Sequence, residues 1–114
     1  MISVTIYQNC GRYTGFLCKG HAGYDQEGYD IVCAAVSALT VNTVNSIETL
    51  TDDAMRVDEK PEGGYLKLER PEEVSEGTNL LMKSLVLGLQ AIEKAYGSQF
   101  LTVTFAGESQ ENMD

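Results

Sequence analysis

The chain has 114 residues, a formal net charge of −9, 43% hydrophobic residues and no tryptophan. Its length fits one domain with a buried core, and its acidic surface disfavours nucleic acid phosphates and anionic lipid head groups as partners. No run of apolar residues reaches the roughly 18 to 20 that a membrane span needs, and no secretory signal is visible, so we expect a cytoplasmic protein. Most of the negative charge lies in residues 51–114, where it would attract a basic protein or simply maintain solubility.

The chain opens with two predicted strands joined by a turn. Apolar and polar residues alternate over Ile2–Tyr7, as is typical of a half-buried strand, and Tyr13–Gly20 indicates a second strand. Asn9–Gly11 supplies the turn, so we expect the two strands to pair as a hairpin. His21, the only histidine of the chain, lies where the second strand ends.

A loop and a long helix follow. Residues 22–29 contain two glycines among polar residues and favour neither helix nor strand. Asp30 is a good N-cap residue, and the pattern from Ile31 to about Leu50 predicts a helix. Counted from Asp30, Cys33 is the N3 residue, inside the first helical turn. The buried stripe of this helix is expected at Val32, Val36, Leu39, Ile47 and Leu50.

Three further strands are predicted in the second half. Ala54–Lys60 and Tyr65–Arg70 are strand-like, and Glu62–Gly64 between them is a hairpin turn. Phe100–Ala106 alternates as a last strand. Residues 107–114 are acidic and polar, which predicts a flexible tail.

A second helix is predicted from Glu73 or Ser75 to Tyr96, with Gly97 as its C-terminal stop. Its apolar stripe is expected at Leu81, Leu85, Leu89, Ile92 and Tyr96. The element order is therefore β-β-α-β-β-α-β, which indicates a single α+β domain over residues 1–106 with two helices packed on a mixed sheet. The order of the strands in that sheet does not follow from the sequence.

Three cysteines, Cys10, Cys18 and Cys33, form an odd set with no CxxC pair. A disulfide framework is therefore disfavoured and a reducing compartment is expected. We interpret Cys10 and Cys18 as core thiols.

Cys33 and His21 together suggest nucleophilic catalysis. A thiol near a helix N-terminus lies in a positive field that favours thiolate, and an imidazole within reach can act as its general base. Free backbone N–H groups of the first turn, that of Cys33 included, could stabilise an oxyanion. Asp30 could orient His21 instead of only capping the helix, and Ser37 lies one turn beyond Cys33 on the same face.

Each of these residues also has a purely structural interpretation. Cys33 could be a small buried hydrophobe, and His21 could be structural or merely exposed. Asp30 needs no role beyond its cap, and Ser37 none beyond helix packing. Under this interpretation the protein is a non-enzymatic module whose acidic face binds a basic protein.

Other chemistries find less support in the pattern. Cys18, His21 and Cys33 with Asp25 or Asp30 could ligate zinc, but close-spaced ligand pairs are missing. No arginine follows Cys33 to cradle phosphate, and the glycines lack nucleotide-loop spacing. A redox-sensing thiol lacks a resolving cysteine nearby in sequence, unless Cys18 folds alongside Cys33.

The segment GHAGYDQEGYDIVCAAVSAL resembles the hallmark of the ribosomal-processing cysteine protease family, Prp. The opening ISVTIY strand and the segment EGTNLLMKSLVLGLQAIEKAY extend the resemblance along the whole chain. The resemblance implies a small cytoplasmic endopeptidase that removes the N-terminal extension of a basic large-subunit ribosomal protein. It also implies a homodimer that needs no cofactor and no metal.

The resemblance assigns roles to individual residues. It implies that His21 is the catalytic base and Cys33 the nucleophile, and that Asp30 and Ser37 support the site. A mobile loop is implied to order over the bound peptide, at Ala22, Gly23, Tyr24, Asp25, Gln26, Glu27, Gly28 and Tyr29.

Overall fold

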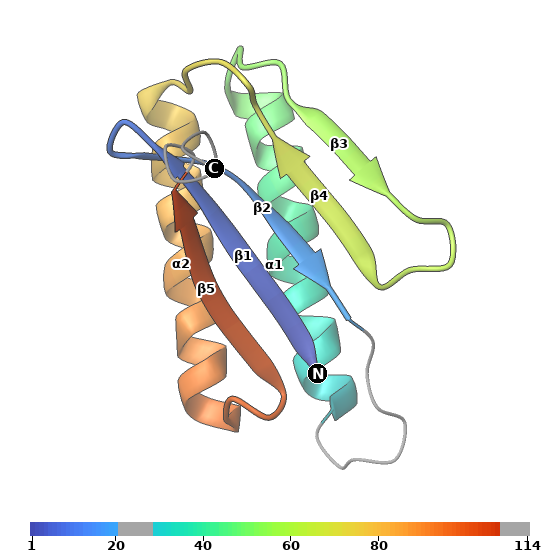
Figure 1. Cartoon of the computed structure of the whole chain (residues 1–114). Coiled ribbons are helices and arrows are strands. Elements are labelled where there is room, and N and C mark those ends of the chain that lie inside the picture. Colours follow the sequence, from blue (N-terminus) through green and yellow to red (C-terminus); the bar gives the residue numbers. More distant parts are fainter. Residues whose placement is uncertain (21–28, 108–114) are drawn as a thin grey trace.

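Alternating apolar residues build a five-stranded sheet, which two helices cover (Figure 1). The computed structural model describes residues 1–20 and 29–107. The elements are β1 (Ile2–Asn9), β2 (Arg12–Lys19), α1 (Tyr29–Leu50), β3 (Arg56–Glu59), β4 (Tyr65–Glu69), α2 (Glu76–Tyr96) and β5 (Leu101–Gly107). Their order and the α+β class with a mixed sheet are as predicted. Gly107, which we assigned to the tail, is the last residue of β5.

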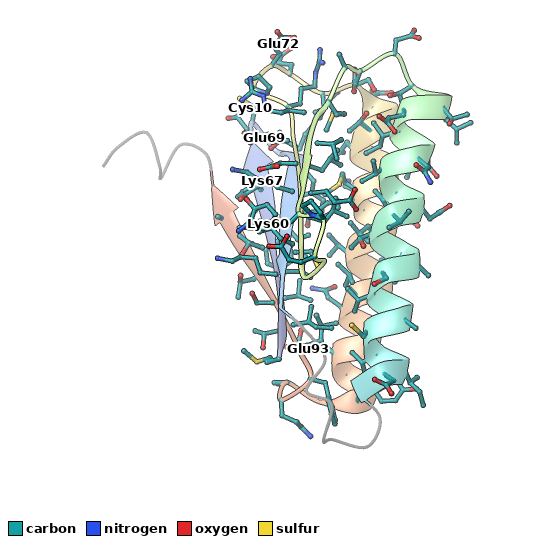
Figure 2. All side chains as sticks on the ribbon, turned by 90° about the vertical axis from the view of Figure 1, so that its right-hand side faces the viewer. Cys10, Lys60, Lys67, Glu69, Glu72 and Glu93 are labelled. Carbon is teal, nitrogen blue, oxygen red and sulfur yellow. The ribbon has the colours of Figure 1, made fainter. Side chains whose placement is uncertain are left out.

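The strand order is β3-β4-β2-β1-β5, with β1 and β5 parallel and the other neighbouring pairs antiparallel. β1 and β2 form the predicted hairpin. Helix α1 connects β2 to β3, and α2 connects β4 to β5, so each helix joins two parallel strands. Strands β2 and β4, from which the two connections start, run in opposite directions, and the connections lead to opposite edges of the sheet, β3 and β5. If both crossovers are right-handed, both helices therefore lie on the same face of the sheet. Figure 2 shows both helices on the same side of the sheet.

The core lies between this sheet face and the two helices. Strand β1 buries alternate side chains, and α1 and α2 supply the apolar residues opposite. The fully buried side chains include Val4, Ile6, Phe16, Val32, Val36, Ile47, Leu68, Met82, Leu89 and Leu101. Two residues of the predicted stripes are exposed: Leu50 at 71% and Tyr96 at 41%. Each is the last residue of its helix, where the helix reaches past the core.

Helix α1 is long and apolar enough to be considered as a membrane span. By length and composition alone, with a mean hydropathy of 1.3, residues Asp30–Leu50 pass for a membrane span. In the fold, Val32, Val36 and Ile47 of this helix are buried against the sheet and α2. A core helix meets the same criteria of length and hydropathy, and α1 has that role here.

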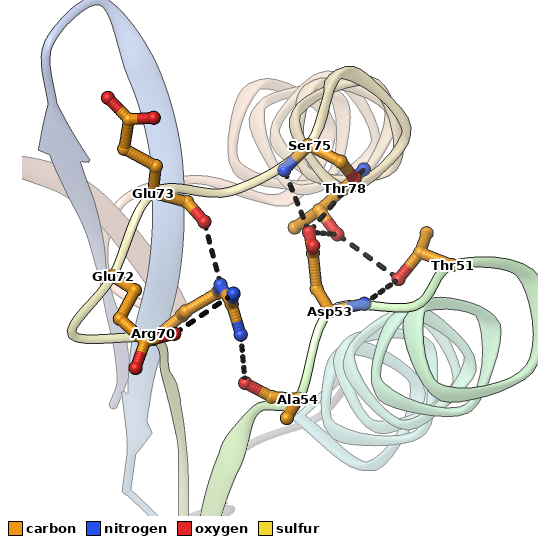
Figure 3. A network of polar contacts seen from close by, with 8 residues as sticks. All are labelled: Thr51, Asp53, Ala54, Arg70, Glu72, Glu73, Ser75 and Thr78. Carbon is orange, nitrogen blue, oxygen red and sulfur yellow. Dashed lines mark hydrogen bonds and ion pairs between the residues drawn. The ribbon is translucent and has the colours of Figure 1, made fainter.

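A polar network joins the end of α1 to the start of α2 (Figure 3). Ser75 is the N-cap of α2, and its hydroxyl oxygen accepts the Thr78 N–H at 3.2 Å. The Asp53 carboxylate accepts the Ser75 N–H at 2.8 Å and the Ser75 and Thr78 hydroxyls. Desolvation raises the pKa of the Asp53 carboxyl, but the hydrogen bonds from Thr78 and Ser75 and the Arg70 charge outweigh it and hold this pKa below the ordinary 3.8.

Arg70 ties the same two loops together from the other side. Its Nε donates to the Glu73 carbonyl at 2.7 Å and its Nη1 to the Ala54 carbonyl at 2.6 Å. Its Nη2 also pairs with the Glu72 carboxylate at 3.1 Å. The segment after α1 and the segment before α2 are therefore held by two adjacent polar groups, Asp53 and Arg70.

We predict that Asp53→Asn lowers the free energy of unfolding at pH 7 by about 1 kcal/mol, because it weakens charge-assisted hydrogen bonds at a partly exposed site. A carboxyl with a lowered folded pKa contributes stability above its unfolded value of 3.8, and this contribution is lost as pH falls through the folded pKa. The difference between variant and parent should therefore shrink below about pH 4. Urea unfolding at pH 7 and pH 3 measures it, with Asp52→Asn at an exposed neighbouring position as control. An Asp53→Asn protein as stable as its parent at pH 7 would contradict the assigned role.

Candidate active site

Gly20 directs the chain out of β2 toward His21. Its φ is +120°, a conformation that side-chain-bearing residues rarely adopt, and a Cβ placed there would collide with the Met1 carbonyl oxygen. Its N–H donates to the Gly64 carbonyl at 3.0 Å, which joins the end of β2 to the β3–β4 turn. The backbone at this point is therefore fixed on both sides. His21 and residues 22–28 lie outside the described residues.

Helix α1 begins earlier than predicted. Tyr29, which we assigned to the loop, is its first residue, and Asp30 lies inside the first turn instead of at the N-cap. Capping preferences locate a helix boundary only to within a residue or two, so a first helical residue at Tyr29 instead of Ile31 lies within that range. Cys33 is consequently the fifth helical residue, and its N–H falls within the i→i−4 ladder, not among the free donors we expected.

Cys33 lines a cavity of about 200 Å³ between α1 and the sheet. Cys33, Ser37 and Val41 form the helix side of this cavity. The sheet side is formed by residues of β2, β3 and β4, among them Cys18, Glu59, Tyr65 and Leu66. The cavity is open to solvent and mixes apolar walls with polar groups, as ligand sites do.

The predicted supporting residues divide into two groups. Ser37 is exposed and lines the cavity with Cys33, as their spacing of one helical turn suggested. Asp30 is exposed in the first turn of α1 and is not among the residues that line the cavity. Its carboxylate lies where negative charge is favourable to the helix dipole. The sequence left open whether His21 contacts Cys33 without substrate, and His21 lies outside the described residues.

Cys18 is the core thiol that we expected, and the structure also places it beside Cys33, which the sequence had left open. It lies on the helix-facing side of β2, packs against the core and faces the same cavity as Cys33. Burial raises the pKa of the Cys18 thiol to about 11, and the nearby Cys33 adds to the shift. Strand alternation already placed Cys18 on the face of Phe16, so the signal was present, but only the packing of α1 reveals its neighbour.

Cys10 corrects another prediction. It is exposed at the β1–β2 turn, with φ of +52°, and is not a core thiol. In Figure 2 it lies at the far end of the sheet from Glu93. The turn needs a residue in the left-handed region there, and the tip of a hairpin offers nothing to bury the thiol.

The described residues were also considered as a metal site. Within residues 1–20 and 29–107, no three histidine, cysteine or acidic side chains lie together so as to hold an ion. Two of the possible zinc ligands, His21 and Asp25, lie outside these ranges.

Comparisons with known proteins agree on one family. A family model described as cysteine protease Prp matches residues 1–100. The ribosomal processing cysteine protease Prp of Staphylococcus aureus (strain NCTC 8325 / PS 47) is 32% identical over 97 residues, covering 84% of this chain and 92% of the relative. The protein of the same name from Bacillus subtilis (strain 168) is 30% identical over 109 residues, covering 91% of this chain and 97% of the relative.

A solved structure shares the fold over nearly the whole length. The crystal structure of Prp from S. aureus in complex with a substrate peptide matches with a TM-score of 0.84 at 28% identity. The match covers 93% of this chain and 100% of that one.

We predict that Gly20→Ala destabilises the protein by roughly 2 kcal/mol or more, because it adds a collision with the Met1 carbonyl oxygen to the strain of a positive φ. Gly11→Ala is the matched control: its φ is +79°, but a Cβ there meets nothing within 4 Å, so it should cost only about 1 kcal/mol. Urea unfolding of both variants measures the difference. Equal losses would show that the approach of Gly20 to Met1 imposes no constraint.

Proposed function

The chain belongs to the cysteine protease Prp family and is a cysteine protease; on that premise, we propose that it removes the N-terminal extension of a large-subunit ribosomal protein. The observation that carries this proposal is the open cavity beside Cys33. Two further findings support it: the relatives are named ribosomal processing proteases, and the S. aureus protein was solved with a substrate peptide. Such processing takes place in the cytoplasm, which is where we propose that the protein acts.

In the proposed mechanism, Cys33 and His21 carry out acyl transfer. His21 takes the thiol proton, and the Cys33 sulfur attacks the scissile carbonyl carbon. The carbon–nitrogen bond then breaks, His21 protonates the leaving amine, and a thioester links Cys33 to the N-terminal fragment. Water activated by His21 hydrolyses the thioester and restores the free thiol. The field of a helix terminus falls off within its first turn, so at the fifth residue of α1 Cys33 depends chiefly on His21.

The remaining predicted residues have secondary roles in this proposal. Ser37, on the cavity wall, is placed to donate a hydrogen bond to the bound peptide. Asp30, away from the cavity, contributes to the first turn of α1 and through it to the position of Cys33. The segment from Ala22 to Gly28 closes over the peptide once it is bound, so the catalytic pair is completed only with substrate present.

The cavity and the surface charge suit a basic ribosomal substrate. Val36, Val41 and Leu66 offer apolar walls to one substrate side chain, and Glu59 provides a carboxylate for a basic one. The net charge of −9 would accelerate encounter with a positively charged precursor, more strongly at low salt. The same charge is the one feature that favours the alternative function, a binding module for a basic protein.

We predict that the protein cuts the ribosomal protein precursor of the same cell once, near its N-terminus, and that Cys33→Ala and His21→Ala abolish the cut. Mass spectrometry of the reaction products measures it. Ser37→Ala should retain cleavage at a rate lowered by up to about tenfold, since one hydrogen bond contributes about 1 kcal/mol. Cys10→Ser, at the far end of the sheet, is the control and should cut at the parent rate.

Two outcomes would decide against the proposal. Tight binding of the uncut precursor by the parent protein would favour the binding module. Cleavage of unrelated peptides, with the precursor left intact, would leave a cysteine protease with a different substrate.

We also propose that the protein is a homodimer in which the outer face of α2 lies in the interface. Leu80 and Leu87 are seven residues apart on one face of this helix, opposite its buried side, and they are 68% and 70% exposed. Ile31, Ala34 and Ala38 share the outward face of the neighbouring α1. Burial of such a face between two copies would stabilise a symmetric pair.

We predict that Leu87→Asp shifts the protein to monomers, because it would place a charge without a partner in an apolar interface. Val57→Asp, at a less exposed apolar residue on the edge strand β3, is the control and should not change the oligomeric state. Analytical ultracentrifugation over a range of concentrations distinguishes the states. A parent protein that sediments as a monomer throughout, or a Leu87→Asp dimer, would refute the interface.

A further inference from the structure

Two thiols from different elements face the same cavity. Cys18 enters it from β2 and Cys33 from α1, and both are free and half-buried. The sequence shows no cysteine close to Cys33 along the chain and leaves open whether Cys18 folds alongside it. The packing of α1 on the sheet supplies that partner.

We propose that Cys18 is the resolving thiol of Cys33: a peroxide oxidises Cys33, and Cys18 then closes a disulfide with it that reversibly blocks the site. The blocking consequence rests on the proposed function, in which Cys33 is the nucleophile. The disulfide itself depends only on the two thiols and the cavity between them.

The chemistry balances in two steps. The Cys33 thiolate attacks one peroxide oxygen, the oxygen–oxygen bond breaks, and Cys33 becomes a sulfenic acid with release of hydroxide. The Cys18 thiolate then attacks the Cys33 sulfur, the sulfur–oxygen bond breaks, and a second hydroxide leaves. The two protons that the thiols gave up combine with the two hydroxides. Overall, two thiols and one peroxide have become one disulfide and two waters.

The environment of Cys18 suits a resolving role. Burial and the neighbouring Cys33 raise the pKa of Cys18 to about 11, so in the reduced protein it stays a protonated thiol that peroxide attacks slowly. Once Cys33 is a neutral sulfenic acid, its charge no longer raises the pKa of Cys18. This change comes at the step in which Cys18 must react as a thiolate. Burial still holds the pKa high, so disulfide closure should accelerate as pH rises toward 11.

The cavity provides the space for closure. In the reduced protein no sulfur–sulfur hydrogen bond joins the two thiols in the described part of the chain, and both cysteines are free. A disulfide requires the two Cβ atoms to lie about 3.8 Å apart, and it would bridge the two walls of the cavity. The closed form therefore loses the free thiol of Cys33.

The test uses the reduced full-length protein, hydrogen peroxide as oxidant, alkylation of the remaining thiols and peptide mapping by mass spectrometry. We expect a peptide pair cross-linked through Cys18 and Cys33, with Cys10 left free to alkylate, and its complete loss on treatment with dithiothreitol. The rate of cross-linking should rise between pH 7 and pH 9 by up to roughly a hundredfold, following the thiolate fraction of a Cys18 thiol whose pKa is about 11. Cys10→Ser is the matched control and should cross-link like the parent.

Cys18→Val replaces the thiol by an apolar side chain of similar size, and circular dichroism checks that the variant folds. With no resolving thiol, its Cys33 should proceed under peroxide to sulfinic acid, which dithiothreitol does not reverse. Measured against its own untreated sample, this variant should lose activity permanently, whereas the oxidised parent should recover it.

The outcomes separate the two proposals. Sulfinic acid at Cys33 of the parent, with Cys18 still free to alkylate, would overturn the inference whatever the activity. A reversible Cys18–Cys33 cross-link in a protein that does not cut its precursor would uphold the thiol pair and refute the proposed substrate.

Discussion

Burial of one sheet face beneath two helices is the constraint on which the rest of this structure depends. The sheet has only one apolar face, given by alternate residues such as Val4 and Ile6 of β1, and both crossover helices must cover it. The opposite face carries polar residues, among them Thr5, Thr104 and the Lys67–Glu69 ion pair. Because all burial is on one side, each helix has one face in the core and one in solvent. The position of every functional group on α1 follows from which of these faces it occupies.

The cavity arises where this cover is incomplete. The sheet extends to β3, whose four residues are all exposed, so α1 does not reach the edge of the sheet. Cys33 and Ser37 lie on the flank of α1 that borders this uncovered region, between the core and the solvent. A thiol in such a place is held by packing on one side and borders the open cavity on the other. The candidate site therefore lies at the edge of the hydrophobic core.

The polar network of Asp53 and Arg70 and the candidate site at Cys33 lie at opposite ends of α1. The Asp53 and Arg70 contacts join the C-terminal end of α1 to the start of α2 (Figure 3), whereas Cys33 lies near the N-terminal end. At that end the Gly20–Gly64 hydrogen bond fixes the last residue before His21. The helix is therefore anchored far from the site, and the site itself is bordered by one fixed backbone point.

Much of this protein could be inferred from its sequence by itself, because the decisive signals are local. Alternation along Ile2–Tyr7 and the Gly97 stop depend on neighbouring residues, and so the element order and the α+β class were predicted correctly. The motif around Cys33 likewise pointed to the family. Helix α1, which starts at Tyr29 and not after Asp30, shows the limit of local rules at a boundary where several residues can cap.

The strand order, the shared face of the two helices and the meeting of Cys18 with Cys33 were decided only by the tertiary structure. Each depends on contacts between residues far apart in the chain, which no short-range pattern encodes. Strand alternation placed Cys18 on a face, but the neighbour on that face is chosen by the crossover of α1. The exposure of Cys10, Leu50 and Tyr96 has the same origin, since an apolar residue is buried only if another element reaches it.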